Sequence, residues 1–330
     1  MAKSDLNMIA WIRSFKHLNF MMRLTIIGFG NQARSWAFNL KDSNFPVRVA
    51  LRSKNASFES VASSGLEAVE IGSSDFFQDE IYALLIPDHL HVEFLKNYGE
   101  HFRPGTTILY AHGYSLLKHQ FELLYPNINH VLYAPKSIGS ELRKQFQIKG
   151  KLGAVYSIEH FHGDSLLFEQ WMKNFSKALG INLGPYKTTI KNETEADLYS
   201  EQGLLCSLIP YAASEMFRGL TEKGIEPELA YFECWHELKL IVNAMVDVGP
   251  KGFFDLISPN ALIGSEKGFQ KLFTNGFQNN LNSLLSEIQD GSFNQEIDEA
   301  NVDEIRNRII NRWKASPLQM TFEKMKQENP

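Results

Sequence analysis

The sequence predicts an α/β protein in two parts: a domain built on a parallel β-sheet, followed by an all-helical domain. Three observations lead to this fold class. The first half alternates short apolar runs with helical stretches, which is typical of a parallel sheet covered by helices. A glycine-containing turn joins the first apolar run to the first helical stretch. After about residue 188 the strand-like runs end, and apolar residues recur at helical spacing.

The apolar runs predict the strands one by one. In chain order we expect strands at residues 24–27, 47–51, 82–86, 107–111, 130–134 and 154–158. Their apolar residues are continuous rather than alternating, which indicates strands that are buried on both faces. The first helix is predicted at residues 31–41 from the spacing of Ala33, Trp36, Ala37 and Leu40. Later helices are predicted at residues 168–179, 199–219, 230–248 and 302–313.

Length and composition limit the functions that are open to the chain. Its 330 residues suffice for two domains, which we place at residues 23–189 and 190–330, after an N-terminal extension of residues 1–22. The net charge of −5 argues against nucleic acid or an anionic membrane surface as a partner. No apolar run is long enough to span a bilayer. Cys206 and Cys234 form no disulfide framework, so we expect a reducing, cytoplasmic location.

The glycine turn has the context of a dinucleotide-binding, Rossmann-type fingerprint. It follows the strand at 24–27 and opens the helix at 31–41 with Gly28, Phe29, Gly30, Asn31 and Gln32. Gly28 permits a tight turn, and Gly30 lets the backbone approach a diphosphate at the helix N-terminus. A glycine turn without a ligand is the alternative. The register of strand, turn, helix and second strand favours a bound dinucleotide.

The segment after the second strand indicates which dinucleotide. An NAD enzyme usually carries Asp or Glu here to bind the ribose 2′-hydroxyl. This chain instead has cations and hydroxyls, among them Arg52 and Ser57, which suit a 2′-phosphate. A solvated basic loop is the alternative, but the position directly after the strand favours NADP.

Two pairs of carboxylates mark the helical half. Asp197 and Glu201 are four residues apart, as are Glu233 and Glu237, so each pair lies on one face of a helix. Apolar flanks suggest that the second pair points inward, where carboxylates need cations. Oxygen ligands without cysteine suit Mg2+. Spacing alone favours the alternative, which is two solvated helix faces.

Taken together, these motifs resemble ketol-acid reductoisomerase in its short bacterial form. The resemblance covers nearly the whole chain, from Arg23 to about residue 320. The stretch from Ala230 to Val242 is the most specific to the family. The other matching stretches, whose spacings also agree, are residues 27–32, 51–52, 85–88, 111–113, 134–136 and 193–198 with 201–202.

The resemblance implies roles for the residues of the helical half. Asp197 would bridge two Mg2+ ions, Glu201 would complete one metal site, and Glu233 and Glu237 would serve the other. Ser258 falls where the family has a substrate-contacting serine. The helical domain is knotted in the family, and in the short form two chains interlock, so a homodimer is implied.

The resemblance also implies roles in the first half. His112 and Lys136 match catalytic residues, which handle protons or water beside the substrate. Contacts to the NADP cofactor are implied for Arg52, Ser57, Asp88, His91 and Gly139. The implied reaction is Mg2+-dependent alkyl migration in a 2-hydroxy-2-acyl acid such as 2-acetolactate, followed by reduction with NADPH. The product is a 2,3-dihydroxy acid of branched-chain amino-acid biosynthesis.

Three segments depart from the family pattern. Ala33 and Arg34 replace a glycine and a histidine, and Ser137 and Ile138 replace Gly-Pro after the lysine. Residues 259–262 differ from the family's Asn-Thr-Ala-Glu. Two alternatives therefore stand beside a true reductoisomerase: a divergent reductase of another keto acid, and a cofactor-binding paralogue without turnover.

Overall fold

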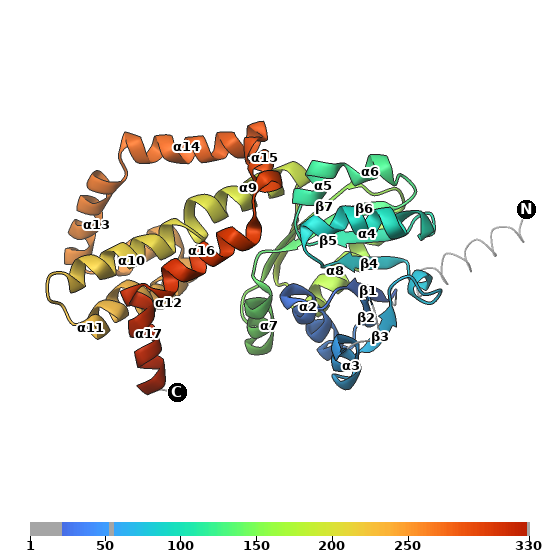
Figure 1. Ribbon diagram of the computed structural model, residues 1–330, viewed down its shortest axis with the longest axis horizontal. Helices are drawn as coiled ribbons and strands as arrows, with labels where there is room; N and C mark the ends of the chain where they lie inside the picture. The colour runs from blue at the N-terminus through green and yellow to red at the C-terminus, as the bar shows by residue number, and fades with distance from the viewer. Residues whose placement is uncertain (1–21, 53–55, 329–330) are drawn as a thin grey trace, which may run out of the picture. The chain divides into compact units, whose positions relative to one another are not determined.

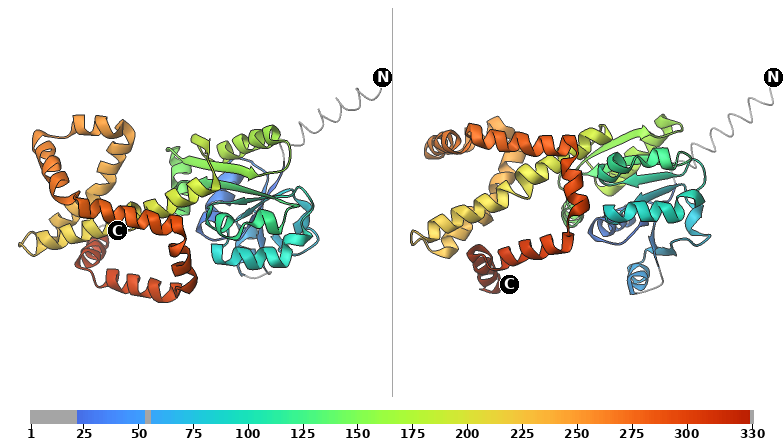
Figure 2. Two further views of the ribbon diagram at one scale, coloured as in Figure 1. Left: turned by 90° about the horizontal axis from the view of Figure 1, so that it is seen from above. Right: turned by 45° about the horizontal axis from the view of Figure 1, so that its top comes forward.

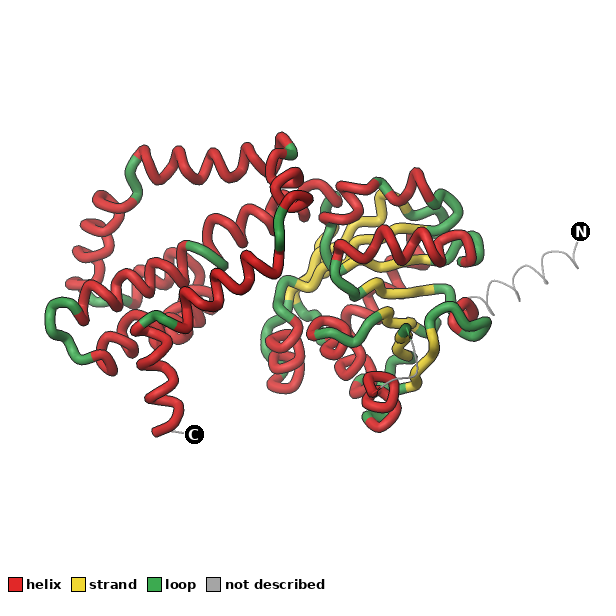
Figure 3. Tube along the Cα trace, viewed as in Figure 1, coloured by secondary structure: helices red, strands yellow, loops and turns green. Residues whose placement is uncertain are grey.

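A computed structural model describes residues 22–52 and 56–328 of the chain (Figure 1). The predicted N-terminal extension lies outside the described residues, apart from Met22. The tertiary contacts divide the chain into two compact units, Met1–Thr194 and Glu195–Pro330. Every strand of the structure belongs to the first unit, and the second is helical (Figure 3). This arrangement confirms the predicted fold class.

The first unit contains an eight-stranded sheet with the strand order β3-β2-β1-β4-β5-β6-β7-β8. All six predicted strands are present, with bounds that shift by at most two residues. The strands are β1 (Leu24–Ile27), β2 (Val47–Leu51), β3 (Glu67–Glu70), β4 (Ile81–Leu84), β5 (Thr107–Tyr110), β6 (Asn129–Pro135), β7 (Gly153–His160) and β8 (Leu183–Lys187). Strands β3 and β8 were not predicted, and β7 runs antiparallel to β6 rather than extending the parallel pattern.

Helices cover both faces of this sheet (Figure 2). Strand β4 shows why its sequence is continuously apolar: Ile81 and Ala83 enter one hydrophobic cluster, and Tyr82 and Leu84 enter the other. The first cluster includes α2 (Asn31–Asp42) and α8 (Ser165–Leu179). The second includes residues of α4 (His91–Tyr98), α5 (Tyr114–His119) and α6 (Phe121–Leu124).

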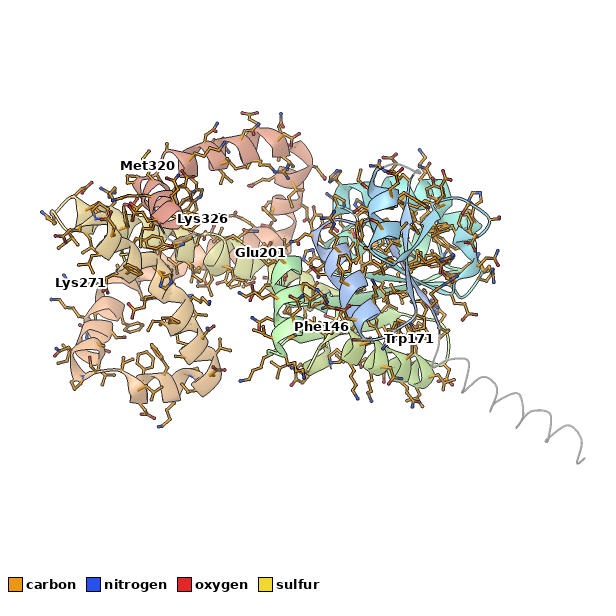
Figure 4. The ribbon with its side chains drawn as sticks, turned by 90° about the horizontal axis from the view of Figure 1, so that it is seen from below. Phe146, Trp171, Glu201, Lys271, Met320 and Lys326 are labelled. Carbon is orange, nitrogen blue, oxygen red and sulfur yellow. The ribbon has the colours of Figure 1, made fainter. Side chains whose placement is uncertain are left out.

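The sequence marks the ends of α8 clearly. The carboxylate of Asp164 accepts hydrogen bonds from the N–H groups of Leu166 and Leu167, which caps the first turn. Gly180 follows the last turn with a φ of 95°, a left-handed conformation that glycine adopts without strain. Between these ends, Trp171 packs among the buried side chains of the first cluster (Figure 4). Helix α8 thereby packs against one face of the sheet and buries it.

The second unit consists of helices and two π-helical segments. A small cluster of Phe217, Ala230, Tyr231, Cys234 and Leu318 forms its buried core. None of its described helices, nor any described helix of the first unit, is long and apolar enough to cross a membrane. The elements are α9 (Ile190–Ser200, which begins in the first unit), η5 (Glu201–Leu205), α10 (Leu208–Thr221), α11 (Pro227–Tyr231), η6 (Phe232–His236), α12 (Glu237–Leu256), α13 (Pro259–Leu272), α14 (Asn275–Asp290), α15 (Ser292–Glu299), α16 (Val302–Lys314) and α17 (Pro317–Glu328).

Candidate functional site

The carboxyl edge of the sheet collects the predicted site residues of the first unit. Strands β1, β4, β5 and β6 are neighbours in that order and run parallel, so the segments that follow them meet at one edge. These segments carry Gly28, Asp88, His112 and Lys136. Ligands of open α/β sheets bind at this edge, where the strand order reverses, here between β1 and β4.

The glycine turn is built for close approach of a ligand. Gly28 has a φ of 102°, and a Cβ atom there would lie 2.9 Å from the carbonyl oxygen of Leu85. A Cβ atom on Gly30 would meet nothing within 4 Å. Helix α2 begins directly after Gly30, with no side-chain cap and no acidic residue in its first turn. Unbonded N–H groups at a helix N-terminus favour an anion, so the turn fits the diphosphate of a dinucleotide.

Gly139 ties a second loop to the glycine turn. It is the first residue of α7 (Gly139–Ile148), and a Cβ atom there would lie 2.5 Å from the carbonyl oxygen of Asn31. The Ser35 hydroxyl lies 2.5 Å from the carbonyl oxygen of Gly139 and 3.0 Å from that of Asn31. The loop after β6 and the N-terminus of α2 therefore form one rigid surface.

The substitution Gly139→Ala should weaken binding of the dinucleotide. The added methyl group displaces the N-terminus of α2, and overpacking of this kind costs about 1–3 kcal/mol, so we expect a roughly tenfold higher Kd for NADPH. Titration of the cofactor fluorescence measures this. Gly219→Ala is the matched control, because a Cβ atom there meets nothing within 4 Å. An unchanged Kd in Gly139→Ala would show that the contact does not shape the cofactor site.

Lys136 forms an ion pair with a buried glutamate, Glu193, for which the sequence predicts no role. The Lys136 ammonium donates to Glu193 Oε1 at 2.6 Å, and the side chain of Glu193 is 1% exposed. The backbone N–H of Gly113 donates to the other carboxylate oxygen at 2.8 Å. A buried carboxylate requires such partners. Glu193 thus joins the loop after β5 to the loop after β6.

Helix α9 places Glu193 at this point. The N–H of Ile190, at the start of the helix, donates to Glu159 Oε2 on β7 at 2.7 Å. Gly113 leaves no room for a side chain, because a Cβ atom there would overlap Thr194 Oγ1 and lie 2.8 Å from Glu193 Oε2. The sequence does contain a signal for Glu193: it stands one helical turn before Asp197, which stands one turn before Glu201.

His112 lies beside this pair. One of its ring nitrogens lies within 4.8 Å of a carboxylate oxygen of Glu193, and Nδ1 lies 4.0 Å from Asp88 Oδ2. Its ring stacks on that of Tyr114, with 6.3 Å between the centroids. The structure therefore brings together His112, Lys136 and Asp88 of the predicted residues and adds Glu193. Cations and carboxylates in this arrangement can bind a polar substrate and move protons.

His91 is buried below the loops. Its Nδ1 lies 2.7 Å from Ser115 Oγ, and its Nε2 lies 3.0 Å from the carbonyl oxygen of Ile86. Burial lowers the pKa of His91, although Asp88 acts in the opposite direction. Both ring nitrogens are thus bonded within the protein. A direct side-chain contact of His91 with the cofactor remains a prediction.

Arg52 and Ser57 frame the position where a 2′-phosphate is predicted. Arg52 directly follows β2 and is exposed. Ser57 lies on α3 (Ala56–Ser63) and is also exposed. Strand β2 neighbours β1, so its carboxyl end lies beside the glycine turn. The two side chains are therefore accessible to a dinucleotide bound at that turn.

The four predicted metal ligands lie in the second unit at unusual helical segments. Asp197 is on α9, and Glu201 is the first residue of the π-helix η5 (Figure 4). Glu233 lies within the π-helix η6, and Glu237 begins α12. Single π-helical turns are rare and occur frequently at functional sites. Both pairs thus coincide with a local feature that often accompanies function.

The orientation expected for the second pair is wrong. Glu233 and Glu237 are exposed, and so are apolar neighbours such as Leu240 and Ile241. These apolar side chains of α12 are therefore not buried within their own unit. The apolar residues around Glu233 and Glu237 do not indicate that the two carboxylates are buried. Among the described residues, no three of the four predicted ligands bring their oxygens within 4.8 Å of one another.

Ser258 forms the N-cap of α13. Its hydroxyl accepts a hydrogen bond from the N–H of Ala261 at 3.2 Å, and Pro259 follows as the first helical residue. Serine at the cap and proline at the first position are both favoured at helix starts. The departure at Pro259 therefore suits the local structure. The substrate contact of Ser258 remains a prediction.

Two family models match the chain. The model of the acetohydroxy acid isomeroreductase NADPH-binding domain matches residues 21–182. The model of the ketol-acid reductoisomerase C-terminal domain matches residues 190–329.

Solved structures share the fold. An NADH-preferring ketol-acid reductoisomerase from an uncultured archaeon is 23% identical, with a TM-score of 0.81 over 94% of this chain and 96% of the other. A semialdehyde dehydrogenase NAD-binding protein from Cupriavidus necator is 14% identical, with a TM-score of 0.60 over 81% and 98% of the chains. A pyrroline-5-carboxylate reductase from Coxiella burnetii is 12% identical, with a TM-score of 0.59 over 82% and 98%. At these identities the likeness concerns the fold alone.

The family models identify the protein family, which the shared fold alone does not. Between them they span nearly the whole chain, and they agree with the resemblance that the sequence motifs predict. The sheet edge with its glycine turn provides the nucleotide-binding surface that such a family requires. The protein therefore belongs to the ketol-acid reductoisomerase family and is an NAD(P)-dependent oxidoreductase.

Proposed function

We propose that the protein is an NADPH- and Mg2+-dependent reductoisomerase of branched-chain amino-acid biosynthesis. Its substrate would be a 2-hydroxy-2-acyl acid such as 2-acetolactate, and its product a 2,3-dihydroxy acid. The observation that carries the proposal is the ion pair between the exposed side chain of Lys136 and the buried carboxylate of Glu193, with 2.6 Å between Nζ and Oε1. Lys136 lies at the carboxyl edge of the sheet, directly after β6, and Glu193 lies on α9, the helix that contains Asp197 and ends directly before Glu201.

The reaction has two balanced steps. The tertiary hydroxyl on C2 loses its proton, an alkyl group moves with its bonding electrons from C2 to the neighbouring carbonyl carbon C3, and C2 becomes a ketone. The oxygen on C3, which this migration leaves as an alkoxide, takes up a proton and becomes a hydroxyl. A hydride then adds to C2, and a proton adds to its oxygen. When bound, two Mg2+ ions would supply the Lewis acidity that stabilises charge on the adjacent oxygens. When bound, NADPH would supply the hydride.

The residues of the first unit have definite tasks in this scheme. Glu193 orients the Lys136 side chain, because its carboxylate forms an ion pair with the ammonium, with 2.6 Å between Oε1 and Nζ. The ammonium then donates a hydrogen bond to a substrate oxygen as negative charge develops there. His112, within 4.8 Å of Glu193 and 4.0 Å from Asp88, exchanges protons with the substrate or with water.

The donor set suits the metal that we propose. Four carboxylates from Asp197, Glu201, Glu233 and Glu237 offer only oxygen ligands, which Mg2+ prefers. No three of these four carboxylates come within 4.8 Å of one another in one chain, so we infer that a second copy supplies one of the two pairs. The exposed apolar side chains of α12 support a homodimer, because an exposed apolar patch often marks a protein–protein interface. On α12 this patch includes Leu240, Ile241, Val242, Met245, Val246 and Val248.

Arg52→Ala should separate the two nicotinamide cofactors. Loss of a charge-assisted hydrogen bond to the 2′-phosphate costs about 1.5–3 kcal/mol, so the KM for NADPH should rise about tenfold or more. The KM for NADH should change little, because NADH lacks that phosphate. Initial rates with each cofactor measure the difference. Arg103→Ala, on the same unit and remote from the turn, is a control for general loss of positive charge. An equal rise in KM for NADPH and NADH would contradict the assignment of Arg52 to the 2′-phosphate.

Consumption of NADPH tests the proposed function. Purified protein with 2-acetolactate and Mg2+ should oxidise NADPH, and chelation of the metal should stop the reaction. Oxidation with another 2-keto acid and none with 2-acetolactate would identify a divergent reductase, the alternative that Ser137 and Ile138 motivate. No oxidation with any keto acid, despite tight NADPH binding, would identify a cofactor-binding protein without turnover.

A further inference from the structure

His91 lies at the centre of a buried group that connects two loops of the site. It is the first residue of α4 and is 2% exposed. One ring nitrogen reaches Ile86 in the loop after β4, and the other reaches Ser115 in the first turn of α5. The edge of the ring packs against Tyr110 at the end of β5, with 5.6 Å between the centroids. A single side chain therefore touches the segments that follow β4 and β5.

The partners determine which ring nitrogen carries the proton. A carbonyl oxygen can only accept, so Nε2, at 3.0 Å from Ile86 O, must be the N–H donor. In the neutral ring Nδ1 then has no proton and accepts the hydrogen bond of the Ser115 hydroxyl at 2.7 Å. Burial lowers the pKa of His91, which favours the neutral ring, although Asp88 acts in the opposite direction. The contact thus needs one donor and one acceptor on the same side chain.

The two loops that His91 joins position groups of the proposed site. Ile86 stands two residues before Asp88, and its Cγ2 lies 3.0 Å from where a Cβ atom of Gly28 would be. Ser115 stands three residues after His112 and two after Gly113, whose N–H binds Glu193. Displacement of either loop would therefore move His112 relative to Asp88 and to the glycine turn.

We propose that His91 is a positioning residue, which clamps the loop after β4 to the start of α5 and so fixes His112 beside the cofactor turn. The proposal rests on the proposed function for its kinetic consequence, but the clamp is a property of the protein alone. It requires the donor and acceptor pair of the ring rather than its volume. Glutamine offers an amide N–H donor and a carbonyl acceptor, whereas leucine offers neither.

The test compares His91→Gln, His91→Leu and Ser115→Ala in the full chain. Hydrogen–deuterium exchange without cofactor reports on residues 85–92 and 111–117. We expect faster exchange in both segments for His91→Leu and Ser115→Ala, and exchange close to wild type for His91→Gln. With NADPH, Mg2+ and 2-acetolactate, kcat should fall about tenfold for the first two variants, because misplacement of a catalytic group by about 1 Å can cost up to a hundredfold. The KM values for NADPH and 2-acetolactate should change less than about threefold, since the residues that contact them are not substituted.

The outcomes separate the two proposals. If wild type does not oxidise NADPH with 2-acetolactate, the proposed function fails, while the exchange pattern still decides whether the clamp exists. Unchanged exchange at 111–117 in both His91→Leu and Ser115→Ala would overturn the clamp. Failure of His91→Gln to restore kcat, with protein as stable as wild type, would overturn it as well. Should His91→Leu fail to fold, Ser115→Ala alone tests the contact, because it removes a single hydroxyl.

Discussion

Glu193→Gln is expected to lower kcat with NADPH and 2-acetolactate by about a hundredfold to a thousandfold, the range found when one preorganised electrostatic group is removed from an active site. The amide can still accept the N–H of Gly113, but it cannot pair with the ammonium of Lys136 as a carboxylate does at 2.6 Å. Lys136 then loses the ion pair that orients its ammonium. Steady-state rates at saturating substrate measure the loss.

Glu195→Gln is the matched control, because it lies two residues further along the same helix and bonds Gln289 at the surface. We expect it to keep nearly all of the activity. Thermal unfolding of both variants separates an effect on the site from an effect on folding. If Glu193→Gln keeps kcat within about threefold of wild type, the ion pair has no part in orienting a catalytic group.

Glu233→Gln is expected to abolish Mg2+-dependent turnover while NADPH affinity stays nearly intact. A neutral amide is a much weaker ligand for Mg2+ than a carboxylate, and the nucleotide binds in the other unit. Rates across a titration with Mg2+, together with the Kd for NADPH, measure the two effects separately. Glu228→Gln is a suitable control, since this exposed carboxylate pairs with Lys324 on a neighbouring helix. Activity of Glu233→Gln at ordinary Mg2+ concentrations would show that the metal assignment is wrong.

The local sequence predicts the central sheet well and its edges poorly. Strands β1, β4 and β5 are buried on both faces, so apart from Thr25 and Thr107 their residues are apolar and the strands are easy to recognise. Strand β3 has glutamates at both ends, and β8 contains glycine and proline, so neither resembles a strand. The antiparallel direction of β7 depends on its pairing with β6, which its own residues do not specify.

The candidate site divides in the same way. Residues that follow the strands, such as His112 and Lys136, can be placed at one edge because parallel strands share a carboxyl edge. The spacing of residues 193, 197 and 201 can single out Glu193, but it cannot show that Glu193 pairs with Lys136, which is 57 residues away in the sequence. The exposure of Glu233 cannot be predicted from the sequence either. Apolar residues beside it indicate a buried surface, but they do not show whether the same chain or a second copy buries that surface.

In the proposed reaction the site moves an alkyl group before it delivers hydride, and the structure of the product distinguishes this order from direct reduction. The protein is incubated with 2-acetolactate, Mg2+ and NADPH, and the product is examined by proton NMR. Migration followed by reduction gives 2,3-dihydroxy-3-methylbutanoate, whose two methyl groups share C3 and appear as two singlets. Direct reduction of the ketone gives 2,3-dihydroxy-2-methylbutanoate, in which one methyl group is split into a doublet by its neighbouring hydrogen. We predict the two singlets; a methyl doublet would contradict the reductoisomerase assignment.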